Sequence, residues 1–147
     1  MIIKSFKDEW ESLKKIYENG SFEYNDTSHT FSSCVDLHFR SVKRQQKYGV
    51  YLVRQRDTGE ILYIGKSGTI NSKGQFLGQD IPDRLKNVKD GRIPANQWFK
   101  DLCVEKGPLV IEYIFLPVSN SPALIEAILL QAYLNEYNHL PYKNKKL

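Results

Sequence analysis

Apolar residues recur every three or four positions near the start of the chain, which is the spacing of one helix face. Ser5-Phe6-Lys7-Asp8 matches a capping box at the beginning of this pattern. Asn19-Gly20 ends it. The face carries four large residues, Phe6, Trp10, Leu13 and Tyr17. We therefore predict a packing helix that begins after Ser5 and ends before Asn19.

A second helix is predicted after a polar segment. Residues 21–30 are polar and rich in turn formers, so we expect a loop there. The next segment repeats apolar residues at helical spacing, at Phe31, Cys34, Val35, His38, Phe39 and Val42. Both helices precede residue 48. Together they predict a helical N-terminal extension over residues 1–47.

Three later segments have the composition of β-strands. Tyr48 to Gln55 and Ile61 to Gly65 are joined by Asp57-Thr58-Gly59, which contains strong turn residues. This pattern predicts a β-hairpin. Leu109 to Leu116 combines β-branched and aromatic residues and is typical of a buried central strand.

The segment after the hairpin is rich in glycine. Ser67 to Gln79 contains Gly68, Gly74 and Gly78 and little apolar periodicity, so we expect an exposed loop. Asp80 can then cap a helix that has Pro82 in its first turn. This helix is predicted to extend to Asp90-Gly91 and to carry Arg84, Leu85 and Val88.

Two more helices complete the pattern. Trp98, Phe99 and Leu102 mark one helix, which Gly107-Pro108 closes, and Ser121-Pro122 begins the last one. We find no internal repeat and no domain linker. The sequence therefore predicts one compact α+β unit, in which a small three-stranded antiparallel sheet is flanked by helices. Residues 48–147 form its main part.

Composition narrows the class of protein. The 147 residues fit a single globular domain. The longest apolar stretches, such as Tyr113 to Leu116, are far shorter than the roughly 18 residues of a membrane span. The first residues become charged at Lys4 and lack the apolar core of a secretion signal, so we expect a cytoplasmic protein. Cys34 and Cys103 form no CxxC pair and are expected to be core thiols.

The charge balance has the sign expected of a nucleic-acid binder. The net charge is +4 and the pI is near 9.0. The basic residues gather in two places: Lys43, Arg44, Lys47, Arg54 and Arg56 in one run, and Lys143, Lys145 and Lys146 near the carboxyl terminus. Such runs are also typical of solvated faces, so charge alone does not identify the partner.

Glu126 is an anomaly in the last helix. It is the only charged residue between Ala123 and Asn135. At 100° per residue it shares a face with Leu129, Leu130, Tyr133 and Tyr137. An acidic residue in the second turn can simply favour the positive end of the helix dipole. A carboxylate on the core side otherwise needs a cation, which is an arginine, a lysine or a bound metal.

The hairpin carries two tripeptides, Gly49-Val50-Tyr51 on its first strand and Tyr63-Ile64-Gly65 on its second. This arrangement resembles the GIY-YIG nuclease family, in which such a pair is followed by an arginine on one helix and a glutamate on another. Arg84 and Glu126 match these two positions in the expected order. The fold and function that the resemblance implies are a GIY-YIG-like sheet and a metal-dependent endonuclease that hydrolyses DNA.

The resemblance extends from about Tyr48 to Asn144 and departs from the family pattern in two places. The segment between Gly65 and Arg84 is longer than the usual link, so it is interpreted as an insertion. The family's terminal asparagine has two candidates. Asn138 lies at a suitable distance from Glu126, whereas Asn144 ends a Pro-x-x-Asn sequence and is the one we favour.

The chemistry of these residues fits phosphodiester hydrolysis. Glu126 can hold one divalent ion that keeps several waters, which is the habit of Mg²⁺, with Mn²⁺ as the alternative. Arg84 offers a permanent planar charge for phosphate oxygens. Tyr51 and Tyr63 can orient or deprotonate water, and a tyrosine base would need a neighbouring cation, which is Lys66 or the metal. Lys66 matches a lysine of several family members.

Further residues are expected to bind DNA outside the bond that is cut. They are Lys66, Lys73 in the glycine-rich segment, Asn144 and Asn138. Recognition could also involve residues 1–47 or a second copy of the chain in a homodimer. Two other functions stay open: a catalytically inactive nucleic-acid-binding module of the same fold, and a small interaction protein in which the tyrosines and the arginine only pack.

Overall fold

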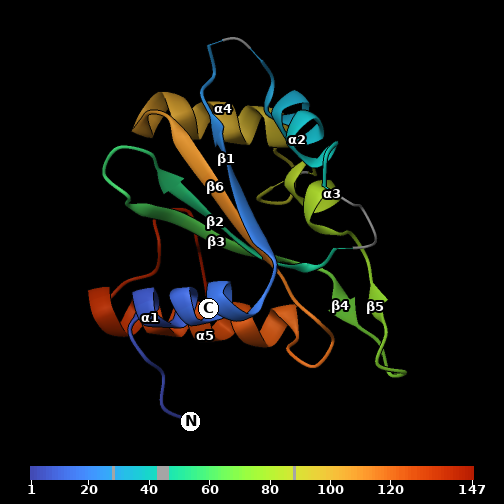
Figure 1. The fold of residues 1–147 in the computed structure, drawn as a ribbon. Helices are drawn as coiled ribbons and strands as arrows, with labels where there is room; N and C mark the ends of the chain where they lie inside the picture. Colours follow the sequence, from blue (N-terminus) through green and yellow to red (C-terminus); the bar gives the residue numbers. More distant parts are fainter. Residues whose placement is uncertain (28, 43–46, 88) are drawn as a thin grey trace.

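A four-stranded antiparallel sheet lies at the centre of the computed structural model (Figure 1). Its strands, in spatial order, are β1 (Asn19–Tyr24), β6 (Leu109–Phe115), β2 (Gly49–Gln55) and β3 (Ile61–Ser67). The structure describes residues 1–27, 29–42, 47–87 and 89–147. Lys43 and Arg44 of the basic run and Val88 of the Arg84 helix lie outside these ranges. The predicted α+β class, the hairpin and the buried central strand are confirmed.

The prediction of three strands is wrong, because β1 is a fourth. It belongs to residues that were expected to form a loop in a helical extension, and it pairs along its length with β6, from Asn19↔Ile114 to Tyr24↔Leu109. β1 is an edge strand whose side chains are mostly exposed or half-buried. Such a strand needs few apolar residues, so its sequence does not show the alternation of a half-buried strand clearly.

Helices cover both faces of the sheet (Figure 1). α1 (Phe6–Ile16) and α5 (Pro122–Tyr137) lie on one face. α2 (Phe31–Phe39), α3 (Ile81–Leu85) and α4 (Ala95–Lys106) lie on the other. The side chains of Ser5, Asp80 and Ser121 cap α1, α3 and α5 as the sequence predicts. α3 is shorter than predicted, since it ends at Leu85 and not near Asp90.

The alternation of side chains along β2 divides the apolar core in two. Val50 and Leu52 pack with α1 and α5, whereas Tyr51 and Val53 pack with α2, α3 and α4. Cys103 is buried as predicted, Cys34 is only partly buried, and both thiols are free. Within the described ranges, no helix combines the length and the apolar character that a membrane span requires.

The glycine-rich segment is largely exposed, as predicted, but it is not only a loop. It contains a second, two-stranded sheet formed by β4 (Thr69–Ile70) and β5 (Phe76–Leu77). We refer to residues 69–77 as the arm, which extends away from the main sheet (Figure 1). The Tyr48 ring stacks on Phe76 with centroids 4.4 Å apart, and its hydroxyl donates to the Gly78 carbonyl oxygen at 3.4 Å. Short strands closed by glycine turns give too weak a periodicity to be recognised in sequence.

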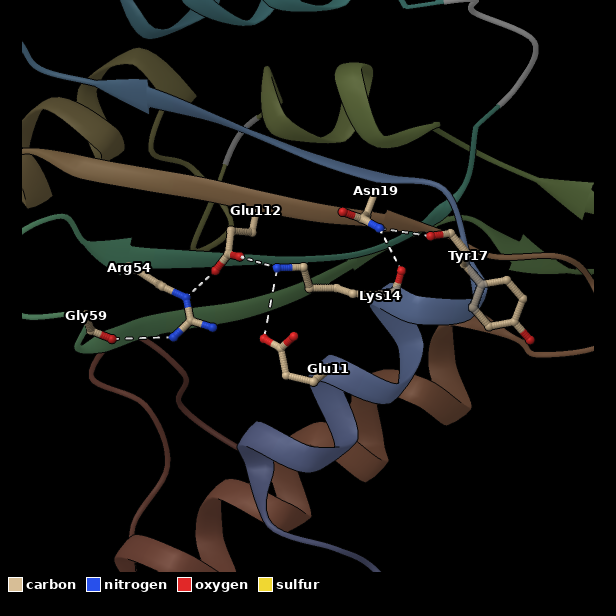
Figure 2. A network of polar contacts seen from close by, with 7 residues as sticks. All are labelled: Glu11, Lys14, Tyr17, Asn19, Arg54, Gly59 and Glu112. Atoms are coloured by element: carbon tan, nitrogen blue, oxygen red, sulfur yellow. Dashed lines mark hydrogen bonds and ion pairs between the residues drawn. The ribbon is translucent and has the colours of Figure 1, made fainter.

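A polar network fixes α1 to the sheet (Figure 2). Glu112 of β6 accepts a hydrogen bond from the Arg54 guanidinium of β2 and lies 3.8 Å from the Lys14 ammonium of α1. Lys14 is also 4.0 Å from Glu11. The Glu112 side chain is 16% exposed and that of Glu11 is 49% exposed. Glu112 is therefore the half-buried carboxylate that neutralises two cations.

We expect Glu112→Gln to lower the free energy of unfolding by about 1–3 kcal/mol, because it removes the half-buried negative charge that the cations of Arg54 and Lys14 share. Urea denaturation measures the loss. Glu11→Gln is the matched control, and its exposed ion pair should cost less than about 0.5 kcal/mol. Equal losses in the two variants would contradict the assignment of Glu112 as the centre of the network.

Candidate active site

The pairing of β2 with β3 places the two tyrosines on one face of the sheet. Tyr51 lies opposite Gly65 and Val53 lies opposite Tyr63. Since side chains two residues apart share a face, Tyr51 and Tyr63 are diagonal neighbours on the side covered by α3 and α4. Their ring centroids are 6.0 Å apart.

Glycine at position 65 gives Tyr51 its place. A Cβ atom at Gly65 would lie 2.4 Å from Cζ and 2.6 Å from the hydroxyl oxygen of Tyr51, which is too close for any side chain. The ring therefore lies directly against the backbone of β3. Gly49 has a similar constraint, because a Cβ there would lie 1.9 Å from the carbonyl oxygen of Ile114 on β6. Both tripeptide glycines are thus required by close packing.

Arg84, Lys66 and Glu126 come from three different elements. Arg84 lies on α3, Lys66 on β3 and Glu126 on α5. All three side chains are partly buried. Burial raises the pKa of Glu126, and the positive charges of Lys66 and Arg84 act against this rise. The two cations therefore offset part of the cost of placing a carboxylate on the apolar face of α5.

The tyrosines belong to the same electrostatic group. Burial raises the pKa of Tyr51 well above the usual range and also raises that of Tyr63. In both, the Arg84 charge lowers the pKa and the Glu126 charge raises it. The structure thus places Arg84 and Glu126 near enough for their charges to act on both tyrosines, and Lys66 near enough for its charge to act on Glu126.

The hydroxyl of Tyr51 is buried and makes no well-formed hydrogen bond to a described residue, although the Tyr63 hydroxyl is near enough to contribute to the rise of its pKa. An unpaired hydroxyl in the interior costs about 1–3 kcal/mol. Because its pKa is raised, this hydroxyl stays protonated at neutral pH and is suited to donating a hydrogen bond rather than to removing a proton. An oxygen of a bound ligand would satisfy it.

A small cavity lies between the site and the base of the arm. Its volume is about 160 Å³. Lys66 and Arg84 contribute its charged walls, and the arm and its flanking residues provide Gly68, Thr69, Leu77, Gly78 and Gln79. The two tyrosines and Glu126 do not line it. The cavity has room for a phosphate group and a few waters beside two cations.

The other predicted binding residues lie in different surroundings. The Asn144 side chain accepts from the Ile64 amide and donates to the Ile64 carbonyl oxygen, both at 2.9 Å, so it is committed to the backbone of β3. Asn138 is the left-handed C-cap of α5, at the opposite end of the helix from Glu126. Lys73 is exposed in the turn that joins β4 to β5, where its amide donates to the Asn71 side chain.

A metal ion would find a sparse set of protein ligands at this site. In the ranges that the structure describes, no three side chains of His, Cys, Asp or Glu lie close enough to hold a metal together. Glu126 is therefore a single carboxylate beside two cations. Such a donor fits Mg²⁺, which commonly keeps several waters and completes its shell with substrate phosphate. It does not fit a metal that needs a closed cage of protein ligands.

One charged residue near the site was missed by the sequence analysis. Lys89 is only 3% exposed, and its ammonium donates to backbone carbonyls at the end of α3. Burial, together with the positive charge of Arg84, lowers the pKa of Lys89 to about 7. Its neighbours Asp90 and Gly91 are turn formers, so the sequence predicts a solvent-exposed lysine here. The sequence pattern does not indicate that Lys89 is buried.

We expect Lys66→Met to raise the pKa of Glu126 further, because it removes a positive charge that stabilises the carboxylate. The measurement is a pH titration of the Glu126 carboxyl carbon by NMR. Lys73→Met removes an exposed lysine from the tip of the arm and should leave this titration unchanged. An equal effect of the two substitutions would contradict the arrangement described above.

Comparisons of this chain with protein-family models, with curated proteins and with solved structures found no match. The function proposed below is therefore inferred from the residues of this chain and from their geometry.

Proposed function

We propose that this protein is a metal-dependent endonuclease that hydrolyses DNA phosphodiester bonds and uses Tyr51, Tyr63, Arg84 and Glu126. One observation carries the proposal: the charges of Arg84, from α3, and Glu126, from α5, both act on Tyr51 and Tyr63 of the sheet, where Gly65 leaves the space that the Tyr51 ring occupies. The combination of a guanidinium, a carboxylate and two phenols is suited to binding and polarising a phosphodiester. The order of these residues along the chain, which resembles that of the GIY-YIG family, supports the same function.

Arg84 and Lys66 are assigned to the phosphate. Their side chains line the cavity at the base of the arm, where a phosphodiester would meet both cations. A guanidinium can bind two phosphate oxygens at once, whereas an ammonium acts as a compact charge. As negative charge develops on the phosphoryl oxygens during attack by water, these fixed cations stabilise it without having to reorganise.

Glu126 is assigned to the metal. When bound, a divalent ion such as Mg²⁺ or Mn²⁺ would supply charge stabilisation for the phosphoryl oxygens and for the leaving alkoxide. Lys66 and Arg84 favour the ionised carboxylate that a metal requires, against the opposing effect of burial. The same two cations limit how much negative charge the site offers, which is consistent with a metal that depends on the substrate for further ligands.

The tyrosines are assigned to orientation. Tyr51, as a protonated buried hydroxyl, would donate a hydrogen bond to a phosphate oxygen or to the attacking water. Tyr63 lies beside Tyr51 and is only partly buried, so its hydroxyl can contact a water that comes from solvent. Holding the water in line with the bond that breaks is worth several kcal/mol of the barrier in general.

The direct test is incubation with supercoiled, linear, branched and single-stranded DNA, with and without Mg²⁺. Cleavage that depends on the metal supports the proposal. Binding of DNA without cleavage under every condition would favour the inactive nucleic-acid-binding module. Absence of both would favour an interaction protein in which the same residues only pack.

We expect Glu126→Ala to reduce cleavage by more than about a hundred-fold, because the carboxylate assigned to the metal is lost. DNA binding should be unchanged or stronger, since a negative charge near phosphate has been removed. Glu23→Ala is the control, because Glu23 is an exposed carboxylate on the distant edge strand β1. Full activity of Glu126→Ala in a preparation free of contaminating nuclease would exclude this site for the metal.

We expect replacement of the arm, residues 69–77, by a short Gly-Ser link to weaken DNA binding while the main sheet stays folded. The arm borders the cavity that contains Lys66 and Arg84, and Lys73 at its tip would contact a phosphate outside the bond that is cut. Lys73→Ala alone should remove one phosphate contact, so the slope of log binding constant against log salt concentration should become shallower by about one. Electrophoretic mobility shifts at several salt concentrations measure both effects, and unchanged binding would identify the arm as a surface insertion.

A further inference from the structure

Lys89 is a buried lysine that the proposed chemistry does not use. Its ammonium donates hydrogen bonds to the carbonyl oxygen of Arg84 at 2.8 Å and to that of Asn87 at 3.0 Å, and a longer one to that of Leu85 at 3.4 Å. Lys89 is not among the residues that line the cavity beside Arg84. Its ammonium is therefore directed at backbone and not at a substrate.

The end of α3 needs such a partner. The helix has five residues, and the last carbonyl groups of any helix lack partners within it. A helix this short is not stable by its own hydrogen bonds. A cation at the carboxyl end satisfies these carbonyl groups and interacts favourably with the helix dipole. Lys89 donates to the carbonyl oxygen of Arg84, the residue that carries the guanidinium of the site, and it adds the favourable charge whenever it is protonated.

Lys89 is itself held in place from two sides. Its backbone amide donates to the Ile93 carbonyl oxygen at 2.8 Å, and the Ile93 amide donates back to the Lys89 carbonyl oxygen at 2.9 Å. Its ammonium lies 5.7 Å from the centroid of the Phe99 ring on α4. The lysine thus connects the end of α3 to a neighbouring bridge and to a buried aromatic residue of the core.

We propose that Lys89 is a positioning residue for Arg84. The Lys89 ammonium fixes the carboxyl end of α3 and thereby the direction of the Arg84 guanidinium. This inference rests on the proposed function, in which that guanidinium binds the phosphate. Lys89 contacts Arg84 directly, through the hydrogen bond to its carbonyl oxygen, so no other residue is needed to connect the two. A shift of about 1 Å in a group that binds the transition state can cost about a hundred-fold in rate.

The test compares Lys89→Met with Lys86→Met. Lys86 follows α3 directly and forms an ion pair with Asp36 at 2.7 Å, so the control removes a cation from the same helix end without removing the carbonyl contacts of Lys89. For variants shown to be folded by circular dichroism, we expect kcat for DNA cleavage to fall about 10- to 100-fold in Lys89→Met, with a smaller change in KM. Lys86→Met should keep kcat within about two-fold of the unchanged protein.

A second readout does not depend on nuclease activity. The Nε–Hε NMR signal of Arg84, assigned by its disappearance in Arg84→Lys, should shift or broaden in Lys89→Met and stay in place in Lys86→Met. If the unchanged protein cleaves no DNA, the nuclease proposal fails, whereas this signal still decides whether Lys89 positions Arg84.

Lys89→Gln keeps two N–H donors at this position, and it provides the test if Lys89→Met does not fold. We expect it to preserve more of kcat and more of the Arg84 signal than Lys89→Met does. If Lys89→Met is unfolded, Lys89→Gln is compared with Lys86→Met alone. If Lys89→Met is folded, an Arg84 signal and a kcat that match those of Lys86→Met would overturn the inference. If Lys89→Met is unfolded, the same match in Lys89→Gln would overturn it.

Discussion

The Tyr51 ring lies against the backbone of β3 at Gly65, at a distance that leaves no space for a Cβ atom. This contact places the Tyr51 hydroxyl, which comes from the inner strand β2, against the backbone of the neighbouring strand β3. Tyr63 then lies beside it, and Arg84 and Glu126 approach from helices on opposite faces of the sheet. A larger residue at position 65 would push the Tyr51 ring away from β3. The geometry of the site therefore depends on a glycine at this position.

The two faces of the sheet are stabilised by different physical means. On the face of α1, a half-buried carboxylate, Glu112, joins two strands and a helix through charge. On the face of α3 and α4, aromatic packing dominates, with Phe31 stacked on Phe99 and Trp98 against Tyr63. The Trp98 ring packed against Tyr63 restricts the rotation of that tyrosine, and a restricted group loses less entropy when it orders a substrate or a water.

The sequence predicted those parts of the fold that have strong local signals. Capping residues such as Ser5 and Asp80 and the alternation along the hairpin marked most elements, and the ordered set of Tyr51, Tyr63, Arg84 and Glu126 identified the candidate site. The strand β1 and the arm were missed because an exposed edge and two-residue strands leave little periodicity. The bonds of Asn144 to Ile64 and of Lys89 to α3 could not be predicted, since they depend on tertiary contacts of polar side chains that look solvated in sequence.

The residues near the carboxyl terminus cover the outer edge of β3. The Lys143 amide donates to the Leu62 carbonyl oxygen at 2.8 Å, and the Asn144 side chain occupies both backbone groups of Ile64. An uncovered strand edge is a template on which another chain can add a strand. The edge beside the tyrosines is therefore closed to this kind of association, while β1 at the far side of the sheet pairs on one side only. Within the main sheet, a strand-to-strand contact between copies of this protein would form at β1, away from the surface assigned to DNA.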